Sequence, residues 1–275
     1  MKIYAFSDEA SPKLKNQIAA LRRNGLSGME IRNTDYGNVS GLTLSQAREI
    51  KEMLSDAGLS VWSAGSPIGK IGIDGDFKAH LDQFRHTLEV TDALGAKNIR
   101  MFSFYLPEEK DPSLYKNQVM DYLGEFLRAA EGSGIDLCHE NEKGIYGDIA
   151  PRCKEIFDTH PKMKCVFDPA NFIQCGQETL SAWEMLKGHV KYMHVKDALA
   201  SGQVVPAGCG VGNLSKIIAA FKEMGGESLS IEPHLKIFEG LAQLEGGKRP
   251  AVDDFAYPTA DAAFDAACNA LKALL

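Results

Sequence analysis

Four short segments of the chain carry side chains suited to metal chemistry. They are HENEKG with Glu140, FDPAN with Asp168, YMHVKD with His194 and SIEPH with Glu232. Each follows an apolar run of the kind that forms strands, so each candidate ligand stands at the end of an expected strand. Three carboxylates and one imidazole suit Mn²⁺, Mg²⁺, Co²⁺ or Zn²⁺. Each motif alone is more often a turn or a buried polar residue. The prediction of a metal site therefore depends on whether the fold brings all four motifs to the same place.

The elements that must position these residues alternate between short strands and amphipathic helices about eight times. Such alternation with short turns predicts parallel strands joined by right-handed crossovers. A length of 275 residues without a break in composition favours one α/β domain over residues 1–275, a closed (β/α)8 TIM barrel. An open doubly wound sheet is the alternative. The expected strands are Lys2–Phe6, Gly28–Arg32, Ser60–Ala64, Asn98–Ser103, Asp136–Glu140, Cys165–Asp168, Tyr192–Val195 and Leu229–Glu232.

Alternation along the strands places the four candidate ligands on one face. Side chains two residues apart share a face of a strand, and the apolar neighbours Leu137, Phe167, Met193 and Ile231 mark the face toward the helices. All four candidates fall on the opposite, inner face, at the C-terminal ends of their strands. In TIM barrels this rim carries the active site. His139 has the outer phase, which predicts a structural role.

The same alternation turns Glu30 and Arg32 inward at the end of the second strand, while Arg100 begins the fourth strand and could reach the lower barrel. A pair of Glu30 with either arginine would neutralise buried charge. Leu235–Pro258, rich in glycine and mixed charge, is either a lid over the barrel mouth or a solvated insertion. The glycine-rich run 208–212 is either a tight turn, the reading we favour, or a phosphate cradle.

Composition excludes several classes of protein. A formal charge of −7 gives no support for nucleic-acid binding. The longest apolar stretches are far shorter than the ~20 residues that span a bilayer, and the first residues do not read as a signal peptide. The six cysteines are scattered without a C-x-x-C pair, which indicates reduced, mostly buried thiols and no thiolate zinc site. We therefore expect a cytoplasmic protein.

From residue 2 to the last helix the chain resembles the xylose isomerase-like TIM-barrel superfamily, the sugar phosphate isomerase/epimerase group, and within it the ketose 3-epimerases. The resemblance is most specific at HENEKG, FDPANF, HVKD followed by PAGCGVGN, and SIEPH. It implies one divalent metal ion, foremost Mn²⁺, bound by Glu140, Asp168, His194 and Glu232. It also implies a small-molecule carbohydrate substrate and a homo-oligomer, either a dimer or a tetramer.

Two positions depart from the ketose 3-epimerase pattern. Asn171 stands where many of these enzymes have a histidine, and Ala200 where they have a substrate-binding arginine. The endonuclease IV branch of the superfamily needs additional histidines for a three-zinc cluster. This chain has no histidine on the third or fourth strand, and Ala207 and Cys209 replace an aspartate and a histidine of that branch. A DNA-repair nuclease is therefore not expected.

The predicted function is a metal-dependent isomerase or epimerase that moves a proton through an enediolate of a keto-sugar, a sugar phosphate or a polyol-derived ketone. Glu140 and Glu232 would exchange the proton while also binding the metal. A dehydratase of a keto-inositol or dehydroshikimate type is one alternative, and a non-catalytic sugar-binding barrel is another. The expected substrate contacts are Trp62, Glu142, Lys143, Tyr146, Asn171 and Lys196.

Overall fold

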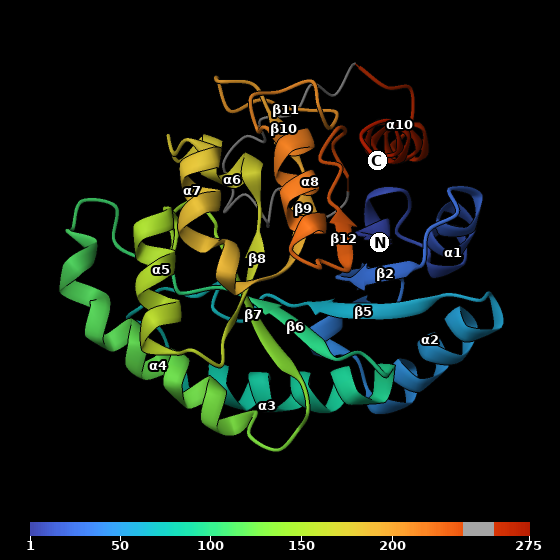
Figure 1. The fold of residues 1–275 in the computed structure, drawn as a ribbon. Helices are drawn as coiled ribbons and strands as arrows, with labels where there is room; N and C mark the ends of the chain where they lie inside the picture. Colours follow the sequence, from blue (N-terminus) through green and yellow to red (C-terminus); the bar gives the residue numbers. More distant parts are fainter. Residues whose placement is uncertain (239–255) are drawn as a thin grey trace.

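Eight parallel strands close into a barrel in the computed structural model, which describes residues 1–238 and 256–275 (Figure 1). Around the barrel the order is β1, β12, β9, β8, β7, β6, β5 and β2, and β1 closes the ring by pairing with both β2 and β12. The strands are β1 (Lys2–Ala5), β2 (Gly28–Ile31), β5 (Ser60–Gly65), β6 (Asn98–Met101), β7 (Asp136–Glu140), β8 (Lys164–Phe167), β9 (Val190–Val195) and β12 (Ser228–Ile231). The predicted TIM barrel is confirmed, and the open sheet is wrong.

Helices follow the strands and surround the barrel (Figure 1). Their ends are set by local signals: Thr43 and Gln46 form a reciprocal capping box before α2, and Gly95 ends α3 in the left-handed conformation. The helices are α1 (Leu14–Arg23), α2 (Leu44–Asp56), α3 (Phe77–Leu94), α4 (Lys116–Ala129), α5 (Ala150–Thr159), α6 (Pro169–Gln174), α7 (Thr179–Leu186), α8 (Leu214–Glu223) and α10 (Ala260–Lys272). Two hairpins leave the barrel, β3 (Asn33–Thr34) with β4 (Gly37–Asn38) and β10 (Asp197–Ala198) with β11 (Val204–Val205).

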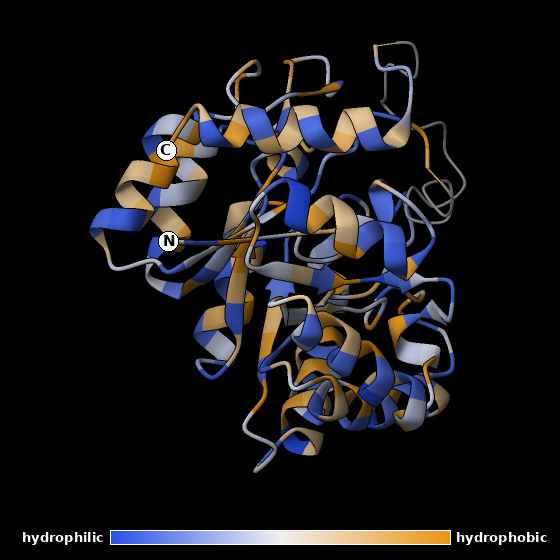
Figure 2. Cartoon of the chain, turned by 90° about the vertical axis from the view of Figure 1, so that its right-hand side faces the viewer, coloured by the Kyte–Doolittle hydropathy of each residue, from blue (hydrophilic) through white to orange (hydrophobic). Residues whose placement is uncertain are grey.

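The two faces of the barrel wall bury different sets of side chains. The outward apolar residues of the strands pack against the helices in one large core, which includes Leu137, Phe167 and Met193. The inward residues Cys138, Val166 and Tyr192 form a separate small cluster inside the barrel, with Trp62 packed against it. Figure 2 shows hydrophobic and hydrophilic residues alternating along the helices, as expected for helices with one buried face. The predicted strand alternation is therefore confirmed.

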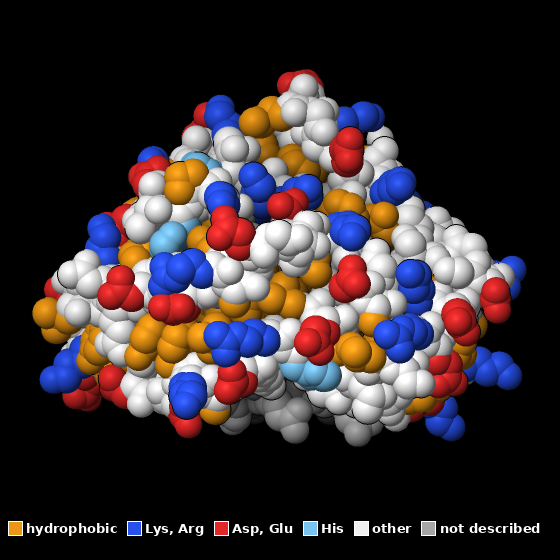
Figure 3. Space-filling model, turned by 90° about the horizontal axis from the view of Figure 1, so that it is seen from below, with side chains coloured by type: hydrophobic (Ala, Val, Ile, Leu, Met, Phe, Trp, Pro, Cys, Tyr) orange, Lys and Arg blue, Asp and Glu red, His pale blue; other side chains and the backbone are white. Residues whose placement is uncertain are grey.

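The surface agrees with the expectations from composition. On the face shown in Figure 3, acidic and basic side chains are interspersed rather than gathered into a basic patch. Among the residues that the structure describes, no helix is both long and apolar enough to cross a membrane. All six cysteines are free, and four of them are buried. The greater part of the predicted lid, Leu235–Pro258, lies outside the described residues.

Candidate metal centre

The four predicted ligands converge at the C-terminal mouth of the barrel. One oxygen from each carboxylate and one nitrogen of His194 lie within 4.8 Å of one another, and all four residues are buried. The Nδ1 atom of His194 is 3.0 Å from Glu140 Oε1, 3.5 Å from Glu232 Oε2 and 3.8 Å from Asp168 Oδ2. Donor atoms that share one ion at roughly 2.1 Å lie about 3.0–3.5 Å apart at octahedral or tetrahedral angles. The donor set therefore has the chemistry and nearly the spacing of a divalent metal site.

Asp168 illustrates how the local fold presents a free ligand atom. It caps α6, and its Oδ1 accepts the backbone N–H of Asn171 at 2.9 Å. The side chain of Asn141 holds the backbone of Asp168 through both its N–H and its carbonyl group. The other oxygen, Oδ2, is buried beside Lys196 Nζ at 2.9 Å and His194 Nδ1 at 3.8 Å. Because Oδ1 serves the helix cap, Oδ2 is the oxygen that remains to bind an ion.

His194 is oriented from behind by Glu30. The Nε2 atom of His194 lies 3.0 Å from Glu30 Oε2, and Tyr192 donates its hydroxyl to Glu30 Oε1 at 2.6 Å. A carboxylate behind a ligating histidine fixes the ring and its tautomer, and it directs the other nitrogen at the metal. The direct partners of Glu30 are thus His194 and Tyr192 rather than Arg32 or Arg100, although the charge of Arg100 helps to lower the pKa of Glu30.

Three buried cations neutralise the carboxylates. Lys196 Nζ lies 2.8 Å from Glu232 Oε2 and 2.9 Å from Asp168 Oδ2. Arg100 approaches Glu140 at 3.3 Å, and Arg32 approaches the second oxygen of Glu232 at 3.2 Å. Arg100 does not reach the lower barrel, because its partner in register is Gly65, the last residue of β5. Such pairing is what allows this many acidic groups to remain buried.

The two glutamates of the centre have opposite electrostatic environments. Burial raises the pKa of Glu140 above its usual value, although His194 and Arg100 oppose the shift. Burial would also raise the pKa of Glu232, but Lys196 and His234 hold it well below the usual range. The pKa of Lys196 stays well above its usual value because Asp168 and Glu232 outweigh the effect of burial. One carboxyl therefore retains a proton more readily than the other.

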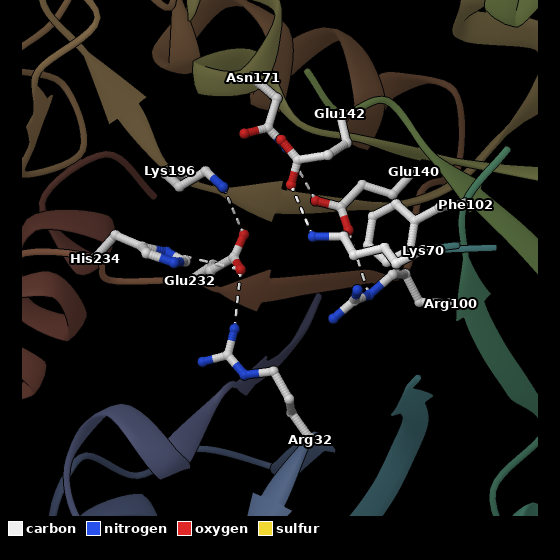
Figure 4. A pocket seen from close by; sticks show the side chains of 10 residues that line it. All are labelled: Arg32, Lys70, Arg100, Phe102, Glu140, Glu142, Asn171, Lys196, Glu232 and His234. Carbon is white, nitrogen blue, oxygen red and sulfur yellow. Dashed lines mark hydrogen bonds and ion pairs between the residues drawn. The ribbon is translucent and has the colours of Figure 1, made fainter. Parts of the chain in front are cut away.

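A pocket opens beside the four candidate ligands (Figure 4). Three of the expected substrate contacts line it: Glu142, Asn171 and Lys196. Asn171 also donates to Glu140 Oε1 at 3.2 Å, so it touches a candidate ligand as well as the pocket. The full lining is Arg32, Lys70, Arg100, Phe102, Glu140, Glu142, Asn171, Lys196, Glu232 and His234.

The structure places the other three expected substrate contacts elsewhere. Trp62 lies at the opposite end of the barrel, stacked on Tyr4 and beside the residues that precede β9 and β12. Tyr146 belongs to the outer core and donates its hydroxyl to Glu155. Lys143 is not among the lining residues, and its Nζ contacts Gln174 at 3.1 Å. Trp62 and Tyr146 are therefore wrong as substrate contacts, and Lys143 lies outside the pocket lining.

Several residues of the site were not expected from the sequence. Lys70 and Phe102 come from the loop after β5 and the end of β6, and Lys70 Nζ lies 4.4 Å from the centroid of the Phe102 ring. Glu9 follows β1 and accepts the backbone N–H of His234 at 2.6 Å. The signal that could have found Glu9 and His234 is their place just after the first and last strands, since those loops meet at the mouth.

The HVKD motif and the glycine-rich run that follows are connected. Asp197 neither pairs with Lys196 nor orients His194; its carboxylate accepts four backbone N–H groups, those of Ala198, Gly208, Gly210 and Gly212. Gly210 and Gly212 must be small because a Cβ at either position would lie within 2.5 Å of Asp197 Oδ1. The phosphate cradle is therefore wrong, and run 208–212 is a turn closed on Asp197.

Sequence comparison agrees with the fold. A family model described as xylose isomerase-like TIM barrel matches residues 18–247, most of the chain. The chain belongs to this family. A comparison with curated proteins gave no match.

Solved structures of this family's fold superimpose over the whole chain at low sequence identity. The probable 3-DHS dehydratase AsbF of Bacillus anthracis is 14% identical, with a TM-score of 0.76 and 99% of each chain covered. D-psicose 3-epimerase of Clostridium cellulolyticum H10, solved with D-tagatose, is 17% identical, with a TM-score of 0.77 and coverage of 100% of this chain and 98% of that one. The IOLI protein, solved with a zinc atom, is 18% identical, with the same TM-score and coverage. At these identities the likeness shows the fold alone.

Proposed function

We propose that the protein is a divalent-metal-dependent isomerase or epimerase of a keto-sugar or a related polyhydroxy ketone, free or phosphorylated. The observation that carries the proposal is the convergence of Glu140, Asp168, His194 and Glu232 on one point beside a polar pocket. The position of Asp168 Oδ2, which the helix cap leaves free of backbone contacts, and the orientation of His194 by Glu30 support a bound ion. Membership of the xylose isomerase-like family supports an enzyme acting on a sugar, as do relatives whose names identify them as ketose epimerases.

The four residues would hold Mn²⁺ or another divalent ion of similar preference. When bound, the ion supplies Lewis-acid activation of a ketone oxygen and orients the adjacent hydroxyl. The protein's own part is then to move one proton at the carbon that lies between those two groups.

Glu140 and Glu232 form the acid–base pair in this proposal. Two strands, β8 and β9, separate them around the barrel, so they approach the pocket from different sides. Glu232, with its lowered pKa, is ionised and takes the proton from carbon, leaving the electron pair in an enediolate of the substrate. Glu140, with its raised pKa, returns a proton to the other face of that carbon, and the roles exchange in the reverse direction.

Lys196 and Asn171 complete the arrangement. Lys196 remains an ammonium group beside Glu232 and Asp168, where it stabilises negative charge that develops on the substrate. Asn171 holds Glu140 from the pocket side through its side-chain amide. Phe102, under Lys70 and Arg100, supplies an apolar wall that limits the access of water.

The test is isotope exchange. The protein is loaded with Mn²⁺, confirmed by elemental analysis, and incubated in D₂O with ketoses, their phosphates and keto-inositols. Deuterium at the carbon next to the carbonyl without loss of water supports the proposal. Loss of water would replace it with a dehydratase, and a site that refuses every divalent ion would exclude both.

Glu140→Gln and Glu232→Gln remove the acid–base groups with little change in shape. At saturating Mn²⁺ each is expected to lower kcat by about 10²–10⁴-fold. Glu49→Gln, an exposed glutamate that binds Tyr36, is the matched control and should retain wild-type kcat. Unchanged exchange in both pocket variants would remove Glu140 and Glu232 from the mechanism.

A further inference from the structure

His234 lies two residues after Glu232 and holds a backbone conformation that residues with side chains rarely adopt. Its φ is 44°, in the left-handed region. Its backbone N–H donates to Glu9 Oε2 at 2.6 Å, and its ring meets Phe238 edge-on with the centroids 5.5 Å apart. Backbone strain of this kind persists where surrounding contacts impose it, and it is concentrated at functional sites. The position of the His234 ring is therefore fixed by the fold.

The ring nitrogen Nδ1 of His234 is buried without a hydrogen bond within residues 1–238 and 256–275. The nearest carboxylate oxygens are Glu9 Oε1 at 3.5 Å and Glu232 Oε1 at 3.7 Å, too far for a hydrogen bond to a ring N–H. The residue is only 5% exposed, yet it lines the pocket, and its ring points toward the neighbouring Glu232 (Figure 4). Because buried polar atoms almost always have a partner, the partner of Nδ1 should enter from the pocket.

A second metal ion is one candidate partner, since Glu9, Glu232 and His234 could together hold a cation. Arg32 argues against it. Its buried guanidinium group lies 3.1 Å from Glu9 Oε1 and 3.2 Å from Glu232 Oε1, so both carboxylates already share a positive charge. An added cation would have to approach that guanidinium group at low dielectric. A neutral oxygen fits the position better, because an imidazole nitrogen can either donate to a hydroxyl or accept from it.

We propose that His234 is a specificity-determining residue whose Nδ1 hydrogen-bonds one hydroxyl of the polyhydroxy ketone substrate. The inference rests on the proposed function, because it assigns a substrate contact within the same pocket. The oxygen of Glu232 that His234 flanks is Oε1, whereas Lys196 contacts Oε2. The hydroxyl therefore belongs to the part of the substrate nearest Glu232 Oε1. Glu9 is a positioning residue, since it holds the backbone N–H of His234 and the guanidinium group of Arg32.

The experiment compares His234→Phe with the wild type on substrates that lack single hydroxyls. Phenylalanine keeps a ring of similar size and removes both nitrogens. Both Mn²⁺-loaded proteins are assayed with the ketose that the wild type converts with the highest kcat/KM, and with its monodeoxy analogues. The wild type should lose about 10–100-fold in kcat/KM on one analogue, since a buried polar atom is then left unpaired. His234→Phe should lose about as much on the parent ketose and nothing further on that analogue.

Two controls separate this role from a structural one. His86→Phe replaces a half-buried histidine of α3 that bonds the carbonyl of Leu42, and it should leave the discrimination among analogues unchanged. If His234→Phe does not fold, His234→Asn serves instead, because asparagine tolerates the left-handed region and keeps a shorter polar group. It should fold and show a reduced preference for the parent ketose over the same analogue.

Four results would overturn the inference. If His234→Phe lowers kcat/KM by the same factor on the parent ketose and on every analogue, His234 has a structural role. If the kinetics of His234→Phe match those of the wild type, His234 does not contact the substrate. A second equivalent of Mn²⁺ that is bound by the wild type and lost in His234→Phe would assign the position to a cation. A wild type that binds Mn²⁺ but neither binds nor converts any ketose would instead reject the proposed function, and the inference with it.

Discussion

His139 and His194 lie on opposite faces of the barrel wall, and both are completely buried. His139 faces the helices, where Nε2 contacts the Ser103 hydroxyl at 2.9 Å and the ring lies edge-on to Phe157 of α5. Burial lowers its pKa to about 3. His194 faces the barrel interior, where Glu140 and Glu30 outweigh the effect of burial and raise its pKa well above the usual value.

The difference shows that burial alone does not determine whether a histidine is charged. The outer face offers His139 a hydroxyl and apolar neighbours, so only the neutral ring is stable there. The inner face surrounds His194 with carboxylates, which favour either a proton or a metal ion on the ring. A shift of one residue along a strand would exchange the two environments.

The largest expected effect separates the two faces by metal affinity. His194→Gln should weaken Mn²⁺ binding by more than the roughly 100-fold that loss of a residue behind a ligand typically costs. His139→Gln should leave the affinity unchanged, because that ring does not reach the pocket. Isothermal titration calorimetry with Mn²⁺ measures both. Equal losses of Mn²⁺ affinity in the two variants would contradict the assignment of the metal site to the inner face alone.

The outer face should be visible in the pH dependence of stability. The folded pKa of His139, about 3, lies below the unfolded value of about 6.5, so below pH 6.5 the unfolded chain takes up a proton that the folded chain refuses. This contribution to stability is complete above pH 6.5 and is lost progressively toward pH 3. It amounts to about 3 kcal/mol between pH 7 and pH 4. Urea unfolding of wild type and His139→Gln over this range should show the steeper loss in the wild type; parallel curves would contradict the prediction.

A smaller effect tests the support behind the inner histidine. Glu30→Gln removes the charge that faces Nε2 of His194 and should lower Mn²⁺ affinity about 10–100-fold. Tyr192→Phe is the graded control, since it removes only the hydroxyl that binds Glu30 and should cost less. An affinity for Mn²⁺ that is unchanged in Glu30→Gln would mean that His194 is held by the barrel packing alone.

The smallest effect concerns Tyr146, on the outer face. Tyr146→Phe removes the hydrogen bond to Glu155 and should lower the free energy of unfolding by about 1 kcal/mol. Because the hydroxyl is directed away from the pocket, kcat and KM should stay at wild-type values. A rise in KM without loss of stability would return Tyr146 to the substrate site.

Periodicity made the barrel and the inner face predictable, and the ends of the strands pointed to the four candidate ligands, which the fold brings together. Periodicity could not predict how far along the barrel axis a side chain lies. Trp62 has the inner phase but lies at the N-terminal end, whereas Arg100, the third of the four residues of β6, reaches the mouth. Residues beyond the barrel strands, such as Tyr146 and Asp197, follow no such period, so their partners are known only from the folded chain. The contacts of Lys196 likewise depend on three separate strands.

The register of the barrel also limits the order in which its strands can pair during synthesis. β1 closes the ring only by pairing with β12, and Lys2 lies opposite Ser228 near the other end of the chain. Glu232 and His234 follow β12, so two of the residues at the mouth leave the ribosome only after the first seven strands. Synthesis proceeds from the N-terminus, and contacts between distant segments form slowly. During synthesis, the candidate metal centre therefore cannot be complete before β12, the strand that closes the barrel, has been made.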